Sequence, residues 1–248
     1  MSEDQLARIR ADVVACRACP RLVAWREQVA REKTARFADE TYWGRPVPGF
    51  GDPNARVLIV GLAPAAHGGN RTGRIFTGDR SGDFLYSSLH RAGLANKAES
   101  RSLDDGLALT GAYVTAVNRC APPGNKPTPD ERDRCLPFLG RELEALSELR
   151  VVVALGAYAW DGILLALTAL GHASKPKPRF GHGTEAVVGP FTIVGCFHPS
   201  QQNTFTGKLT PPMMDEVMTR ASRLAKVGAP DRRGGSGRPR ASGAPTTP

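Results

Sequence analysis

Four cysteines in two pairs carry the strongest chemical signal in this sequence. Cys16 and Cys19 form a C-x-x-C pair near the N-terminus, and Cys120 and Cys135 lie far downstream. Four thiolates around one centre suit tetrahedral zinc or an iron–sulfur cluster, because soft sulfur ligands select those centres over hard cations. The spacing alone leaves both centres open. The alternative is that a cysteine is an ordinary buried apolar residue, which is our expectation for Cys196.

The cysteine content also indicates a compartment. Five cysteines cannot all pair, and the N-terminus lacks the apolar segment of a secretory signal. In a reducing cytosol, C-x-x-C pairs bind metals or act in redox chemistry rather than forming structural disulfides. We therefore expect a cytoplasmic protein.

The charge balance favours a polyanionic partner. The formal net charge is +9, which makes nucleic acid the first candidate. Part of it lies in residues 228–248, a Gly-, Pro- and Arg-rich segment without large aliphatic residues, whose four arginines and one aspartate leave +6 on the rest. Such a segment cannot bury enough surface to offset its ordering entropy. We expect one folded domain over residues 1–227 and a disordered basic tail. No apolar run approaches the roughly 18 residues needed to cross a bilayer.

Apolar runs and amphipathic stretches alternate along the body of the chain. Short β-branched runs typical of buried strands alternate with stretches of helical spacing, and we expect Ser81 to cap the first of the helices. This alternation predicts a three-layer α/β/α domain with a mainly parallel central sheet, in which ligands bind beyond the carboxyl ends of the strands. The predicted strands are 56–61, 112–118, 150–156 and 191–197, and the predicted helices are 81–94 and 157–170.

Two loops after predicted strands are unusual. Residues 61–79 are dense in glycine and small residues, which let the backbone approach a ligand closely, although the P-loop pattern is absent. Residues 197–207 present His198 with a cluster of amides and hydroxyls. A lone histidine at a strand end is more often structural than catalytic, but its polar neighbours favour a functional site.

These two loops, the four cysteines and the stretch from Cys120 to Pro129 together resemble the uracil-DNA glycosylase superfamily. The similarity is greatest to its family 5, or type B, and covers about residues 10 to 226. The resemblance implies a three-layer α/β/α fold and a structural [4Fe–4S] cluster held by Cys16, Cys19, Cys120 and Cys135. It also implies hydrolysis of the bond between uracil and deoxyribose in DNA, which would place the protein at the nucleoid.

The resemblance further implies roles for single residues. Phe76 would stack on the flipped base, and Gly61, Leu62 and Ala63 would form a backbone floor beside the sugar. His198 would donate a hydrogen bond to the base oxygen on which negative charge accumulates.

The chain departs from related families where an acidic or amide residue positions the water. The corresponding stretch here is Ala63-Pro-Ala-Ala66. Asp79 on the same loop is the best candidate carboxylate, and its alternative role is a helix N-cap.

A second departure is Ala116, which occupies the place of a uracil-reading asparagine of the related family 4. Asn118 would share its face in a regular strand, and Asn125 is the other amide available. A pocket without a discriminating amide should be permissive, so we expect activity on hypoxanthine and other deaminated bases as well as uracil.

Several polar and basic side chains are candidate DNA contacts. Phe205 could act as a wedge in the base stack, beside polar residues of the same loop, and three residues of the first loop could clamp phosphates. The alternative for the charged residues is a solvated loop. The candidates are Ser200, Gln201, Gln202 and Phe205, with Asn70, Arg71 and Arg74 at the phosphates.

Two other classes of function stay open from sequence. One is a non-catalytic iron–sulfur or zinc protein that binds DNA, and the other is a redox sensor with an accessible cluster. No feature indicates an oligomer, so we expect a monomer.

Overall fold

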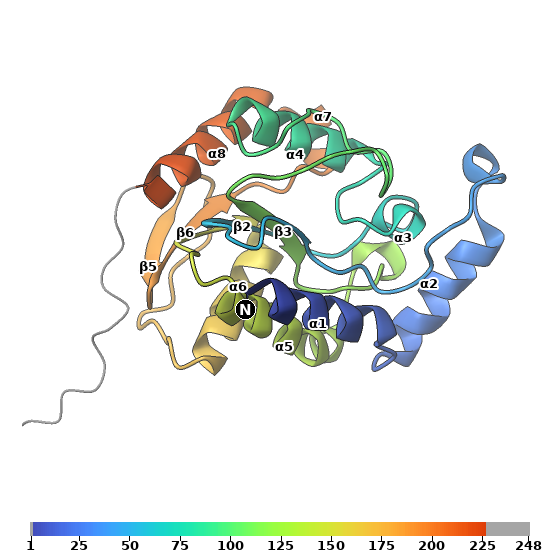
Figure 1. Ribbon diagram of the computed structural model, residues 1–248, viewed down its shortest axis with the longest axis horizontal. Coiled ribbons are helices and arrows are strands. Elements are labelled where there is room, and N and C mark those ends of the chain that lie inside the picture. The colour runs from blue at the N-terminus through green and yellow to red at the C-terminus, as the bar shows by residue number, and fades with distance from the viewer. Residues whose placement is uncertain (1, 227–248) are drawn as a thin grey trace, which may run out of the picture.

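The computed structural model describes residues 2–226, and they form a single sheet flanked by helices (Figure 1). The predicted disordered tail, 228–248, lies outside the described residues. The strand order is β1-β3-β2-β4-β6-β5. The four central strands, β3 (Ala112–Ala116), β2 (Val57–Gly61), β4 (Val151–Leu155) and β6 (Phe191–Cys196), run parallel. The edge strands β1 (Phe50–Gly51) and β5 (Glu185–Val188) are antiparallel to their neighbours.

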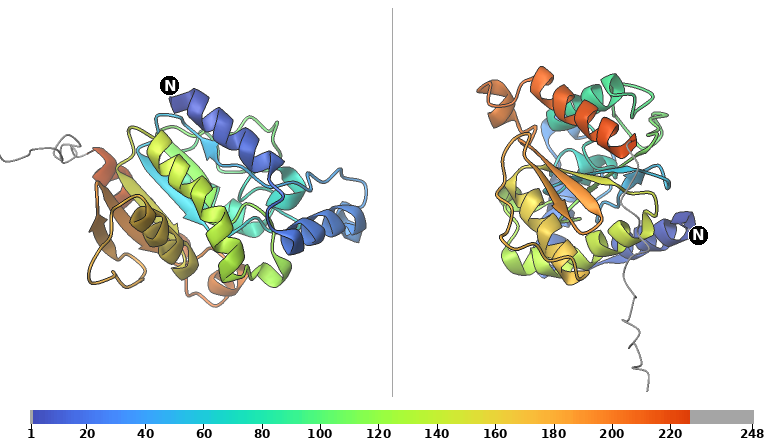
Figure 2. Two further views of the ribbon diagram at one scale, coloured as in Figure 1. Left: turned by 90° about the horizontal axis from the view of Figure 1, so that it is seen from below. Right: turned by 90° about the vertical axis from the view of Figure 1, so that its left-hand side faces the viewer.

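Helices cover both faces of the sheet, which confirms the predicted three-layer architecture. One face carries α4 (Arg80–Arg91) and α8 (Pro211–Lys226). The other carries α1 (Ser2–Ala15), α5 (Pro129–Ala145) and α6 (Ala157–Ala169), seen from below in Figure 2. The remaining elements are α2 (Pro20–Glu32), η1 (Ala35–Phe37), α3 (Gly69–Thr72), η2 (Pro123–Asn125) and α7 (Gln201–Phe205).

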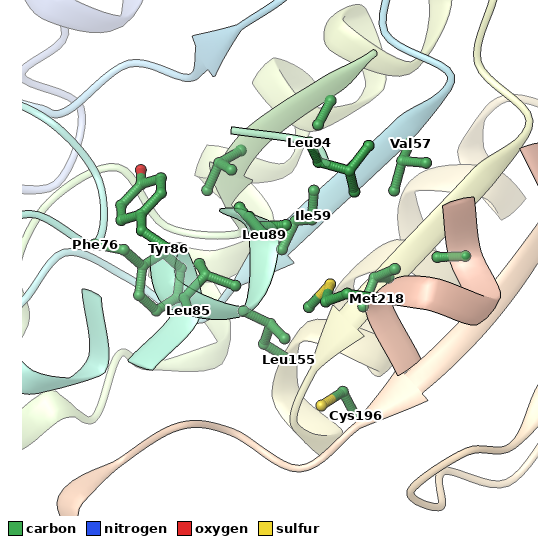
Figure 3. Packing of buried hydrophobic residues seen from close by; sticks show 14 of the residues in the cluster. Val57, Ile59, Phe76, Leu85, Tyr86, Leu89, Leu94, Leu155, Cys196 and Met218 are labelled. Atoms are coloured by element: carbon green, nitrogen blue, oxygen red, sulfur yellow. The ribbon is translucent and has the colours of Figure 1, made fainter. Parts of the chain in front are cut away.

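The side chains of the central strands alternate between two apolar cores. In β2, Val57 and Ile59 pack under α4 and α8, while Leu58 and Val60 pack under α5 and α6. Strands buried on both faces explain why these runs are continuously apolar rather than alternating. Cys196 lies in the first core near Met218, as expected for a packed thiol (Figure 3). None of the helices in residues 2–226 is long and apolar enough to span a membrane.

Most predicted boundaries shift by one to three residues, and two of these differences bear on the site. Ser81 is not the N-cap of α4: Asp79 has the extended backbone of a cap, and its carboxylate accepts a hydrogen bond from the Gly82 N–H at 2.9 Å. The strand predicted over 112–118 ends at Ala116. Beyond it the backbone still donates hydrogen bonds, from the Val117 N–H to the Gly61 carbonyl and from the Asn118 N–H to the Leu62 carbonyl, so an apolar pattern could not mark where the strand stops.

Candidate active site and cysteine centre

The carboxyl ends of three neighbouring parallel strands lie at one edge of the sheet, and such sheets bind ligands in the crevice beyond these strand ends. Gly61 ends β2, Gly156 follows β4, and His198 follows β6. The Gly156 N–H donates to the carbonyl of Cys196 at 2.8 Å. A Cβ added at Gly156 would lie 3.2 Å from the Cβ of His198. Glycine at this position therefore leaves the space in which the histidine sits.

Phe76 is held by glycines beneath it and beside it. A Cβ on Gly61 would come within 2.6 Å of the Phe76 ring, and one on Gly82 within 1.9 Å of the Phe76 carbonyl. The Phe76 backbone has a φ of +53°, a region that costs a non-glycine residue about 1–3 kcal/mol and is enriched at functional sites. Tyr86 braces the turn by donating to the Ile75 carbonyl at 3.0 Å.

His198 faces Phe76 across the crevice, with ring centroids 6.0 Å apart and planes tilted by 38°. Burial lowers the pKa of His198 to about 4, because desolvation disfavours the charged form. The imidazole is therefore neutral near pH 7 and carries one N–H donor. Within residues 2–226 no protein group hydrogen bonds to its ring nitrogens, so this donor is available to a ligand.

Asp79 serves as a cap and also lies close to the first loop. Its carboxylate is so near Gly68 that a Cβ there would lie 2.0 Å from one oxygen. Burial raises the pKa of Asp79 above its usual range, opposed by hydrogen bonds from the backbone of Gly82 and Ser81. The capping role is thus present in the structure, and a role in placing water stays a prediction.

The two candidate amides do not converge on the crevice in the expected way. Asn118 points to the opposite face of the sheet from Ala116. Its amide donates to the Glu131 carbonyl at 3.1 Å and accepts from the Tyr158 hydroxyl at 2.6 Å. The period-2 expectation fails here because β3 has already ended. Asn125 is exposed on η2 with a φ of +56°, so it stays free to meet a ligand.

The three candidates for phosphate clamps are buried and bonded to protein. Arg74, 2% exposed, binds Asp105 at 2.5 Å and Ser100 at 2.9 Å. Arg71 pairs with Glu40 and donates to the carbonyls of His67 and Gly78. Asn70 is fully buried and donates to the Arg26 carbonyl. These side chains hold the first loop in shape and are not presented to a phosphate.

Other exposed cations, missed from sequence, lie where the first loop meets α7. Arg80 stacks on Phe205 at 5.1 Å, and the Phe205 ring is 67% exposed. Lys208 lies 5.0 Å from the ring centre of Phe197, the residue before His198. Gln201 and Gln202 are exposed on the same helix, and their contact with DNA stays a prediction, whereas the Ser200 hydroxyl caps the helix by accepting from the Asn203 N–H. Arg80 and Lys208 become candidate DNA contacts only because the fold places them near Phe205 and the His198 segment.

The four predicted cysteine ligands line one small enclosed cavity, which places the α1–α2 junction beside the start of α5. Burial raises the pKa of Cys120 to about 11 and that of Cys135 to about 12. Two buried arginines adjoin the cavity. The Arg26 guanidinium donates to the Cys120 sulfur at 2.9 Å, and the backbone N–H of Arg119 donates to the Cys135 sulfur at 3.3 Å.

Comparison with known proteins agrees with this arrangement. A model of the uracil DNA glycosylase superfamily matches residues 48–221. The Type-5 uracil-DNA glycosylase of Mycobacterium tuberculosis is 54% identical over 224 residues, 90% of this chain and 82% of that protein. The Type-5 uracil-DNA glycosylase of Thermus thermophilus is 54% identical over 214 residues, 86% and 95% of the two chains. The Type-4 uracil-DNA glycosylase of Archaeoglobus fulgidus is 34% identical over 114 residues, 46% and 49% of the two. The chain therefore belongs to the uracil-DNA glycosylase superfamily and to its type-5 family.

Proposed function

We propose that this protein is a DNA repair glycosylase that removes uracil and leaves an abasic site. The observation that carries the proposal is the pairing of Phe76 with a neutral His198 at the carboxyl ends of the parallel strands. Family membership supports it. The names of the relatives in Mycobacterium and Thermus support it too. A non-catalytic DNA-binding protein or a redox sensor is not favoured by these relatives.

The geometry suits a flipped base. A uracil rotated out of the duplex would stack on the Phe76 ring, and the crevice would hold its sugar near Gly61. Rotation costs a few kcal/mol, least for a mispaired base such as uracil opposite guanine. When the bond between C1′ and the base breaks, negative charge moves onto the base oxygens. A preorganised neutral donor such as His198 stabilises that charge, and loss of one such donor typically costs about a hundred- to thousandfold in rate.

Water must add a hydroxyl to C1′ while the leaving base takes up a proton. Asp79 is the carboxylate that we assign to orient this water, since its second oxygen lies beside the first loop at Gly68. Burial raises the pKa of Asp79, and its backbone hydrogen bonds, which favour the ionised form, oppose that rise. The backbone of residues 63–66 is the alternative site for the water.

A permissive pocket follows from the absence of a discriminating amide. Ala63 to Ala66 offer no side-chain donor or acceptor, and Asn118 is committed to Glu131 and Tyr158. A site rejects a wrong base strongly when that base leaves buried polar groups of the protein unpaired, and a site without such groups discriminates weakly. Hypoxanthine and other deaminated bases should therefore be substrates as well.

We assign DNA binding to the exposed edge formed by Arg80, Lys208 and α7, with Phe205 as the residue that enters the stack. The cations would contact phosphates, and Gln201 and Gln202 would contact the strand. DNA is the partner that this basic surface fits. We expect the enzyme to act as a monomer in the cytoplasm, at the nucleoid.

The cysteine set fits an iron–sulfur cluster. All four cysteines line one cavity. Thiolate ligands suit zinc and iron–sulfur clusters alike, and membership of the type-5 family is consistent with the cluster. Cys16, Cys19, Cys120 and Cys135 would bind a [4Fe–4S] cluster with a structural role.

The test is turnover. Protein prepared under nitrogen is incubated in excess with a duplex that carries one U·G pair, and alkali-sensitive abasic sites are measured over time. Product that is lost in His198→Ala and kept in the control His90→Ala, an exposed histidine on α4, supports the proposal. Tight binding without product would favour the non-catalytic alternative.

A further inference from the structure

His198 is held from both sides by backbone hydrogen bonds to side chains outside the crevice. On its N-terminal side, the Phe197 N–H donates to Nδ1 of His182 at 3.2 Å. On its C-terminal side, the Asn203 amide donates to the His198 carbonyl at 2.9 Å. The backbone at position 198 is thus fixed by His182 before it and Asn203 after it.

The loop that carries His182 is fastened to β6. Gly183 donates to the Gly195 carbonyl at 2.7 Å, and Gly195 donates to the Thr184 carbonyl at 2.9 Å. Only glycine permits this approach, because a Cβ at Gly195 would lie 2.2 Å from the carbonyl oxygen of Gly181. The His182 ring is therefore placed by the strand that leads into His198.

Contacts with neighbouring residues restrict the orientation of the His182 ring. It packs on the Phe197 ring with centroids 5.0 Å apart and planes tilted by 32°. Because Nδ1 accepts from Phe197, the ring carries its proton on Nε2, which bonds to the backbone of Met213. Burial lowers the pKa of His182, which keeps the neutral form that this acceptor role requires.

We propose that His182 is a positioning residue for His198: its Nδ1 holds the Phe197 N–H and thereby sets where the His198 imidazole meets the base. The inference rests on the proposed role of His198. In this proposal His182 acts through its contact with Phe197 and not on the base itself. Small misplacements of a catalytic group can cost about a hundredfold in rate, so loss of this bond should slow the chemical step while leaving DNA binding largely intact.

Two isosteric variants separate the two hydrogen bonds of His182. In His182→Asn the side-chain oxygen can occupy the place of Nδ1 and still accept from Phe197, but the contact with Met213 is lost. In His182→Gln the amide reaches the place of Nε2, so the Met213 contact is kept and the Phe197 acceptor is lost. Both variants are polar and similar in size, so a general loss of stability should affect them alike.

The experiment measures single-turnover rates on the U·G duplex and, separately, duplex affinity. Thermal stability and cluster absorbance check folding, and His90→Asn and His90→Gln are the matched controls. We expect His182→Gln to be about tenfold to hundredfold slower with affinity unchanged, and His182→Asn to recover most of the rate. Equal rates for the two variants, or recovery by Gln instead of Asn, would overturn the proposal.

A second readout does not depend on activity. The amide signal of Phe197 and the ring signals of His198 in ¹⁵N NMR spectra should move in His182→Gln and stay near the wild-type positions in His182→Asn. If they stay fixed in both variants, His182 does not position the segment. If they move as expected while His198→Ala keeps full activity, the coupling stands and the catalytic role of His198 fails.

Discussion

The ring of Phe76 lies directly against the α-carbon of Gly61, with room for hydrogen and nothing larger: a Cβ at that position would be 2.6 Å from the ring. The end of a buried strand and the residue that should stack on the base therefore depend on each other. Gly61→Ala should push the ring from its position. Because base–aromatic stacking is worth about 1–3 kcal/mol, we expect kcat/KM to fall roughly tenfold to hundredfold.

Gly140→Ala is the matched control, since a Cβ there meets only Leu170 at 4.0 Å. An unchanged kcat/KM in Gly61→Ala would show that the Phe76 ring does not stack on the base.

The state of His198 should be insensitive to pH over the working range. A free histidine titrates near 6.5, whereas burial lowers the pKa of His198 to about 4. Between these two pKa values, the His198 side chain binds a proton in the unfolded chain but stays neutral in the folded chain. The free energy of unfolding is therefore unaffected by this group above about pH 6.5. It falls as the pH is lowered from about 6.5 toward 4, because protonation favours the unfolded chain. NMR titration of the ring should show no transition between pH 5.5 and 8; a midpoint near 6.5 would contradict this environment.

Arg80 and Lys208 should account for part of the salt dependence of DNA binding. Each phosphate contact contributes about 0.9 to the slope of log K against log salt concentration. Arg80→Ala and Lys208→Ala should each flatten the slope by about one, whereas Arg8→Ala, an exposed cation on α1, should not. A duplex binding titration over a range of salt concentrations checks this. An unchanged slope removes the cation from the interface.

Arg74→Ala should act on stability instead of on the salt slope. The side chain is 2% exposed, and its removal would leave the Asp105 carboxylate without its cationic partner, held only by backbone N–H groups. Breaking a buried pair by removing one partner typically costs about 3–5 kcal/mol. Thermal unfolding should therefore show a large loss. A stable variant with a flattened salt slope would restore Arg74 as a phosphate contact.

Two cysteine variants should differ in colour. Cys16→Ser removes a proposed cluster ligand and should give colourless, poorly folded protein. Cys196→Ala changes a fully buried residue of the core; it should lower stability and keep iron and sulfide at wild-type levels. Iron and sulfide assays with visible absorbance decide the matter, and an active, colourless Cys16→Ser protein would refute a structural cluster.

The fold was largely predictable because its signals are local. Runs such as 56–61 and 150–156 are apolar on both faces, and only a strand between two helical layers satisfies them. Phe76 and His198 were chosen through the resemblance of their loops to a known family, and the structure brings their rings together, while their roles stay predictions. In each case the signal lies within one short stretch of the chain.

Long-range partners were not predictable from the chain. Arg74 looked free in a glycine-rich loop, but Asp105, which neutralises it, lies 31 residues away. Asn118 was assigned by alternation, yet Glu131 and Tyr158 turn its amide to the other face. His182 gave no signal at all, since its importance comes only from the packing of its loop on β6.

The residues that line the cysteine cavity are synthesised at very different times. Cys16 and Cys19 leave the ribosome early, and their partner Cys135 appears only after the whole of β1, β2, α4 and β3 has been made. Closing so long a loop carries an entropic cost that bound metal can offset. Until Cys135 has been made, the thiols of Cys16 and Cys19 lack part of their ligand set, so the proposed cluster could join the α1–α2 junction to α5 only late in synthesis.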